Sequence, residues 1–258
     1  VYFTNEADSN TINNIYIQNT LTSTATNFAG VIMSGSATSN TVTGNSGNYN
    51  TISNSIIEGG YYGVRINGSS TAAMVQGNQI LNNEIRDFYI YGIYLIYNGG
   101  TVIDGNDISR ANRATVTTFN GIYLTSGNEN LVVNGNRIHD THNAATTLTG
   151  EANGIYSTSS GATVGNENVI TNNAIYNFNG STGTYYGIRN TGSDGHFYYH
   201  NTVALDNSSS ASGTTYGFYQ TTTASNIEFI NNIVSVTRGG SGIKAAVRHN
   251  TTGSSITS

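Results

Sequence analysis

Residues capable of acid–base chemistry gather in the middle of this chain. Of its 23 Asp, Glu, Lys and Arg residues, 11 lie between positions 84 and 151, about a quarter of the 258 positions. A carboxylate and an imidazole can act as acid and base, and an arginine can hold an anionic substrate. If the protein is an enzyme, we therefore predict a catalytic site made of Arg110, Arg137, His139 and Asp140.

The same charges also have a structural interpretation. When the chain is aligned on an internal repeat of about 30 residues, Glu84, Asp107 and Arg137 occupy equivalent positions in successive repeats. Opposite charges one strand apart attract each other modestly. This alternation of sign favours ion pairs on the surface over a catalytic patch.

A second candidate site is a row of tyrosines and cations with the same repeat. The row follows each Gly-apolar pair and reads Arg65, Tyr94, Tyr123, Tyr156, Arg189, Tyr219, Lys244. Because a position that accepts Arg and Lys is not a core position, we expect the row to face outward. Tyrosine rings at strand spacing form a platform for sugar faces, and Arg189 could pair with an acidic glycan. We predict ligand binding by Tyr94, Tyr123, Tyr156, Arg189 and Tyr219. The alternative is that the rings only cover the sheet as cross-strand pairs.

Two interleaved ladders indicate the elements that position these side chains. Each is a short motif that recurs about every 30 residues, so that every repeat contains one copy of each motif. The first ladder is Gly followed by an apolar residue, at Gly30, Gly63, Gly92, Gly121, Gly154, Gly187, Gly217 and Gly242. The second is Asn-x-apolar, at Asn54, Asn83, Asn106, Asn136, Asn173, Asn201 and Asn232.

A third apolar run precedes most of these Asn residues, for example "TVID" at 101 and "LVVN" at 131. Each repeat thus holds three short β-favouring runs separated by polar turns. This pattern predicts an all-β parallel β-helix, a solenoid of about eight coils with three short strands per coil. At one turn the Asn would adopt the left-handed backbone conformation, and its amide would bond to the Asn of the next coil.

The Asn-x-Ile turn and the Gly-Ile-Tyr strand resemble the right-handed parallel β-helix proteins of the pectate-lyase-like superfamily. The wording "ITNNAIYNFNG" also resembles β-helix repeats of large secreted bacterial surface proteins. The resemblance implies that the Gly-Ile-Tyr strand belongs to the first sheet, which lines the ligand groove. The resemblance gives little support for enzymatic activity. The chain has neither the adjacent Asp-Asp pair of a polygalacturonase-like site nor the proline of the Arg-x-Pro segment of a pectate-lyase-like site.

Composition narrows the classes of partner. The net charge is −5 with a single lysine, which argues against nucleic acid because phosphate contacts need many cations. No apolar run approaches the roughly 20 residues of a membrane span. There is no cysteine, and "DGND" at 104 lacks the further ligands of a calcium loop. We therefore expect no metal and no cofactor.

These observations lead to two functional hypotheses. In the first, residues 1–258 form one β-helix domain of a longer polypeptide, with 1–29 as an irregular or capping coil. It would be a non-catalytic module of a secreted or cell-surface protein, a rigid spacer or adhesin that binds polysaccharide or cell-surface glycan on its tyrosines. In the second, it is a polysaccharide lyase or glycoside hydrolase that acts on an acidic glycan.

Overall fold

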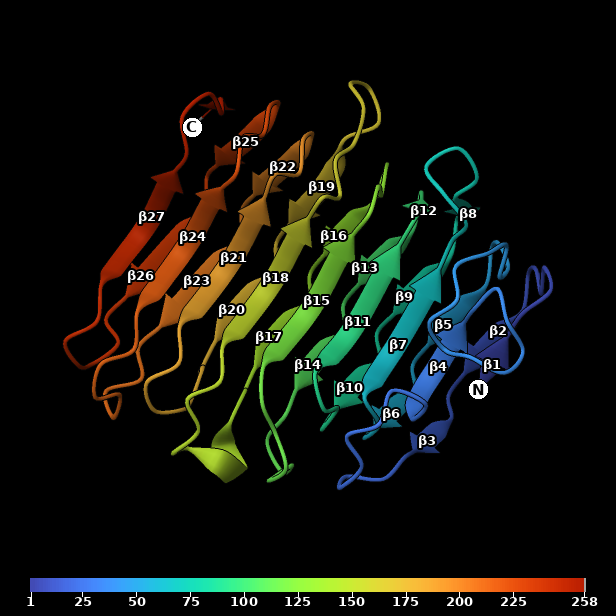
Figure 1. The fold of residues 1–258 in the computed structure, drawn as a ribbon, viewed down its shortest axis with the longest axis horizontal. Coiled ribbons are helices and arrows are strands. Elements are labelled where there is room, and N and C mark those ends of the chain that lie inside the picture. Colours follow the sequence, from blue (N-terminus) through green and yellow to red (C-terminus); the bar gives the residue numbers. More distant parts are fainter. Residues whose placement is uncertain (258) are drawn as a thin grey trace.

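The computed structural model describes residues 1–257, which wind into a solenoid of three long parallel sheets (Figure 1). Within these residues sheet A has nine strands: β1 (Tyr2–Phe3), β4 (Ala29–Met33), β7 (Tyr62–Asn67), β11 (Tyr91–Ile96), β15 (Phe119–Thr125), β18 (Ala152–Thr158), β21 (Tyr185–Thr191), β24 (Thr215–Thr221) and β27 (Lys244–Asn250). Its strands lie side by side at the front of Figure 1, and the two termini lie at opposite ends of the solenoid.

Sheets B and C complete each coil. Within residues 1–257 sheet B contains β2 (Thr11–Asn13), β5 (Thr51–Ser53), β9 (Gln79–Leu81), β13 (Val102–Asp104), β16 (Val132–Asn134), β19 (Asn168–Thr171), β22 (His196–Tyr199), β25 (Ile227–Ile230) and β28 (Ile256–Thr257). Sheet C contains β3 (Tyr16–Gln18), β6 (Ile56–Glu58), β10 (Glu84–Arg86), β14 (Asp107–Ser109), β17 (Arg137–His139), β20 (Ala174–Tyr176), β23 (Thr202–Leu205) and β26 (Ile233–Val236). The predicted all-β parallel solenoid is confirmed, with about nine coils instead of eight.

Few elements depart from this pattern. A short pair, β8 (Val75–Gln76) and β12 (Asn98–Gly99), lies at the corner between sheets A and B. The one helical turn among residues 1–257 is η1 (Asn143–Ala145), and none of the helices described there is long and apolar enough to cross a membrane. Residues 1–29, expected to be irregular or capping, contribute one short strand to each sheet and so take part in the first coil.

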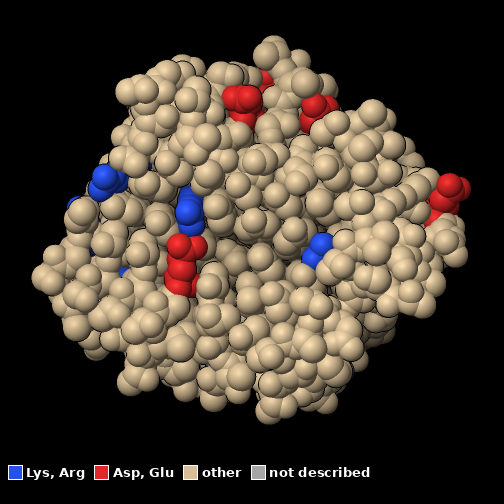
Figure 2. Space-filling model, in the orientation of Figure 1, with Lys and Arg blue, Asp and Glu red and all other residues tan. Residues whose placement is uncertain are grey.

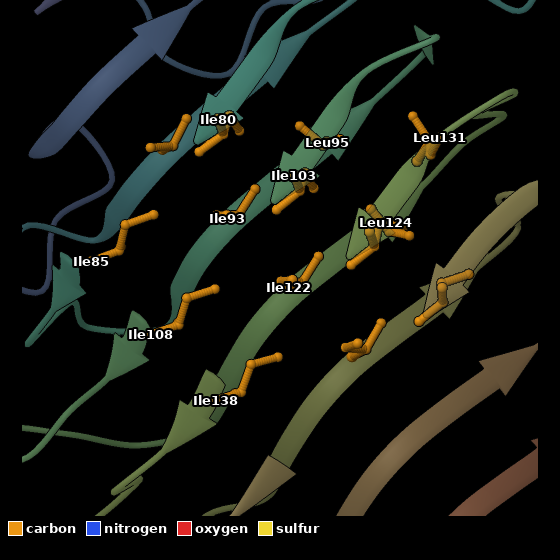
Figure 3. Packing of buried hydrophobic residues seen from close by; sticks show 14 of the residues in the cluster. Ile80, Ile85, Ile93, Leu95, Ile103, Ile108, Ile122, Leu124, Leu131 and Ile138 are labelled. Carbon is orange, nitrogen blue, oxygen red and sulfur yellow. The ribbon is translucent and has the colours of Figure 1, made fainter. Parts of the chain in front are cut away.

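Stacked aliphatic side chains fill the interior (Figure 3). Strand alternation turns these residues inward, and parallel pairing places each above its equivalent in the next coil. Each coil therefore buries the face of its neighbours, which stabilises a chain without disulfides. The fully buried residues labelled in Figure 3 are Ile80, Ile85, Ile93, Leu95, Ile103, Ile108, Ile122, Leu124, Leu131 and Ile138.

The two sequence ladders meet in space. A Cβ atom built on Gly121 would lie 2.5 Å from Cγ2 of Ile138 and 2.7 Å from the carbonyl oxygen of Gly154. Gly92 has the same relation to Ile108, at 2.7 Å. The glycine of sheet A thus leaves room for the isoleucine of sheet C in the same coil. This contact explains why the two marks recur together.

A ladder of asparagine side chains crosses the turn between sheets B and C. In each step the Oδ1 atom of one Asn accepts from the backbone N–H and the Nδ2 of the Asn one coil earlier, at 2.9–3.1 Å. These bonds satisfy buried backbone groups at a place where no strand pairing is available. The residues joined in this way are Asn83, Asn106, Asn136, Asn173, Asn201 and Asn232.

Asn54 does not belong to this ladder, contrary to the prediction. In the pairing of β6 with β10, Ile56 lies opposite Glu84, so Ser55 is the equivalent of Asn83. The backbone N–H of Ser55 donates to Asn83 Oδ1. Asn54 has φ 49° and lies at the left-handed position of the turn, as Asn82 does with φ 54°. The turn therefore uses two adjacent residues, and the left-handed one, which is Gly105 before Asn106, comes before the ladder residue.

Candidate functional site

The outward surface of sheet A, here called the tyrosine face, carries the predicted row. Strand register places Tyr94, Tyr123, Tyr156, Arg189 and Tyr219 side by side on consecutive strands. Arg65 precedes the row on β7, and Arg248 follows it on β27. Lys244 lies outside the row because β27 pairs with β24 through Phe218 and Val247, four residues later than the Gly242 mark suggests.

A second row, made of tyrosines and asparagines, runs beside the first. It occupies the position just before each glycine and reads Tyr62, Tyr91, Asn120, Asn153, Tyr186, Tyr216. Strict alternation would turn these residues inward, yet the ring of Tyr91 lies 5.0 Å from that of Tyr94 on the outer face. The alternation is broken at the glycine, so the repeated "YG" dipeptide was the signal that the sequence analysis missed.

The rings of both rows form two groups in contact, one from Tyr62 to Tyr156 and one from Tyr186 to Tyr219, and Arg189 lies between them. Tyr94 and Tyr123 stack at 5.1 Å with 27° between their planes, and Tyr156 meets Tyr123 edge-on at 5.2 Å. The first-row rings of Tyr94, Tyr123 and Tyr156 are half-buried. Burial raises the pKa of Tyr123 to about 12, so its phenol stays protonated at neutral pH. Figure 2 looks onto this face and shows few charged side chains, among them one basic and one acidic side chain in contact.

Arg189 lies at the centre of the tyrosine face. Its guanidinium carbon lies 4.3 Å from the ring centre of Tyr156 and 4.5 Å from that of Tyr186. Its Nη1 donates to Glu151 Oε1 at 2.9 Å. Glu151 carries no sequence signal for this role, because 38 residues separate it from Arg189 and only the pairing of β18 with β21 brings them together.

Three of the four predicted catalytic residues form a cluster on the outer face of sheet C. His139 Nε2 lies 2.9 Å from Asp107 Oδ1 and His139 Nδ1 lies 2.7 Å from Asp140 Oδ2, while Arg137 pairs with Asp107. The His139 ring also stacks on Tyr176 at 4.9 Å. Burial alone would lower the pKa of His139, but the two carboxylates outweigh it and raise that pKa.

This cluster is arranged as an ion-pair network. Both nitrogens of His139 face carboxylate oxygens, so the ring offers no free nitrogen to a substrate. The hydrogen bond from His139 is the largest cause of the lowered pKa of Asp107. A shallow depression beside the cluster is lined by Asn82, Asn83, Glu84, Gly105, Asp107 and Arg137. Among residues 1–257 no group of three His, Asp or Glu side chains is placed to hold a metal ion.

Arg110 does not join this cluster. It follows β14, turns into the corner between sheets C and A, and is fully buried. Its Nε donates to the carbonyl oxygen of Thr141 at 2.9 Å, and its Nη2 donates to that of Thr117 at 2.9 Å. His142 Nε2 lies 3.0 Å from the same Nη2. Arg110 therefore fastens two corner loops together and does not reach the surface where His139 lies.

Comparison with known proteins agrees with this architecture. A family model described as "right handed beta helix region" matches residues 1–203. No curated protein and no solved structure matches the chain. The match covers the first seven strands of sheet A, the cluster around His139 and the tyrosine face as far as Arg189, and it ends before Tyr219.

Proposed function

Because this chain belongs to the right-handed β-helix family, we propose that it is a non-catalytic solenoid module of a secreted or cell-surface protein. In this proposal the module acts as a rigid spacer or adhesin and binds carbohydrate along its tyrosine face. The glycan is the proposed partner, and the remainder of a longer chain would connect the module to the rest of the secreted or cell-surface protein.

One observation carries the binding part of the proposal. Tyr94, Tyr123 and Tyr156 stand on three consecutive strands with ring centres 5.1 and 5.2 Å apart, and none belongs to the hydrophobic core. Rings that do not fill the core still leave apolar faces partly open to solvent. Such faces can stack on sugar rings while the phenol hydroxyls bond to sugar hydroxyls.

The spacer part follows from the dimensions. Nine strands of sheet A stacked about 4.8 Å apart give a rod about 38 Å long. Within residues 1–257 each coil is paired to the next through all three sheets, except the last, which pairs through sheets A and B, so bending would break several hydrogen bonds at once. A rod of this kind holds a binding face at a constant distance from its attachment point.

Binding is tested by isothermal titration of the chain with neutral and acidic oligosaccharides. Tyr123→Ala removes the ring that contacts Tyr91, Tyr94 and Tyr156, and we expect at least about tenfold weaker binding, or about 1.4 kcal/mol. Tyr199→Ala, on the outer face of sheet B, is the matched control and should bind as the wild type does. Equal effects of both variants, or no binding to any oligosaccharide, would contradict the proposal.

The non-catalytic part is tested separately by incubation with the corresponding polysaccharides, with and without calcium. We expect no new reducing ends and no new unsaturated ends. Release of either kind of end from any polymer would refute the non-catalytic assignment. His139→Gln and Asp140→Asn would then be the first variants to assay.

A further inference from the structure

The centre of the tyrosine face differs from its flanks. The second row is aromatic at Tyr62 and Tyr91 and again at Tyr186, but it holds Asn120 and Asn153 between them. Asn153 is fully buried, and its Nδ2 donates to Asn120 Oδ1 at 3.0 Å and to Glu151 Oε1 at 2.8 Å. Two coils at the centre therefore hold buried amides and a partly exposed carboxylate where the flanks hold rings.

The contacts of Arg189 leave only part of its guanidinium free to bind a ligand carboxylate. Arginine binds carboxylates through two parallel N–H donors on one edge of the guanidinium. On Arg189, Nη1 is taken by Glu151, and Nε is enclosed by protein with no hydrogen-bond partner within residues 1–257. The edge that contains Nε is therefore blocked, and Glu151 already engages one donor of the edge formed by Nη1 and Nη2.

The charge of Arg189 is also neutralised. Glu151 Oε1 lies 2.9 Å from Nη1, and both side chains are partly exposed, at 35% for Glu151 and 19% for Arg189. A ligand carboxylate placed at Nη2 would lie close to a second carboxylate, and like charges at that distance repel. A sugar hydroxyl, in contrast, can donate to Glu151 and accept from Nη2 without a charge penalty.

We propose that the centre of the tyrosine face binds an uncharged sugar unit and that Glu151 is the residue that excludes acidic ones. The inference rests on the proposed carbohydrate binding and specifies the substrate class of that same face. It differs from the expectation that Arg189 pairs with an acidic glycan. Arg65, at the other end of the face, is buried, and its Nε and Nη1 donate to Asn67 and Tyr62.

The test measures affinity by isothermal titration for two neutral probes, cellohexaose and mannohexaose, and one acidic probe, hexagalacturonate. The wild type should bind at least one neutral probe more tightly than the acidic one. Glu151→Gln keeps an oxygen for Arg189 and Asn153 but removes the negative charge. We expect it to shift the acidic-to-neutral affinity ratio about tenfold toward the acidic probe.

Glu228→Gln is the control, because it removes one negative charge from the outer face of sheet B, where Glu228 bonds to Tyr199. Its affinity ratio should equal that of the wild type. Neutral binding with an unchanged ratio in Glu151→Gln, or a wild type that prefers the acidic probe, would overturn the inference alone. Failure of all three probes to bind would overturn both this inference and the proposed function.

Discussion

Replacing Asn136 by alanine should be among the most destabilising single changes at a polar position of the solenoid. Its Oδ1 accepts from the N–H and the Nδ2 of Asn106, at 3.0 and 2.9 Å. Its Nδ2 donates to Asn173 Oδ1 at 2.9 Å and to the carbonyl oxygen of Ile103 at 3.0 Å. Four hydrogen bonds disappear, and the buried N–H of Asn106 is left without a partner. Three of these bonds count at about 1 kcal/mol each, and the orphaned N–H costs about 1–3 kcal/mol in place of the fourth, so the unfolding free energy should fall by about 4–6 kcal/mol.

Asn232→Ala is the matched control at the end of the same ladder. Asn232 also accepts from the N–H and the Nδ2 of its neighbour Asn201, both at 2.9 Å. It is only half-buried, because no further ladder residue covers it in the described part of the chain. Water can then replace the lost partner, and the loss should be about 1–2 kcal/mol.

Urea denaturation followed by circular dichroism measures both variants. The slope of free energy against urea should stay constant if the solenoid still unfolds as one unit. Losses that are equal at the two positions would refute the reasoning, because it attributes the difference to burial within the ladder. A reduced slope in Asn136→Ala would instead show that the two halves unfold separately.

Three further outcomes are expected. Gly121→Ala should lower the unfolding free energy by about 1–3 kcal/mol, since its Cβ would lie 2.5 Å from Ile138 Cγ2, and the loss in thermal or urea unfolding should shrink in an Ile138→Ala background. The folded-state pKa of His139 is raised above 6.5, so its stabilising contribution is complete below pH 6.5 and is lost as pH rises through the folded pKa; His139→Gln should show a smaller fall in urea stability over that range. Burial lowers the pKa of His142 to about 3, so stability should be lost as pH falls below 6.5, and His142→Gln should lose less than the wild type in acid melts.

The fold was largely predictable because each repeat carries the same residue types at the same positions. A small residue at Gly121, an apolar residue at Ile122 and an Asn two places before Ile138 specify a strand, a core position and a turn. Stacking then follows, since a short coil buries its apolar face only against another coil. The ladders predict about eight coils and not nine, because residues 1–29 lack the Gly-apolar motif and still pair with all three sheets.

Asn54 shows where local patterns fail. The turn between sheets B and C takes a left-handed residue followed by a ladder residue, and Asn suits both positions. In the pair Asn82–Asn83 the two roles are visible, but at Asn54–Ser55 the ladder position holds Ser55. Only the pairing of β6 with β10 separates the two roles, since a shift of one residue turns every side chain to the other face.

The candidate site divides in the same way. The chain's own periodicity determined the solenoid, the inward aliphatic rows and the outward row from Tyr94 to Tyr219, because each depends on contacts between equivalent positions of adjacent repeats. Only the tertiary structure decided that Arg110 is buried under corner loops and that Glu151 neutralises Arg189. Those contacts join non-equivalent positions, and the irregular loops that determine them differ in length from coil to coil. Periodicity in the sequence predicts the strand positions that all repeats share. The charge pairs at the site depend on loops and side chains that differ between repeats.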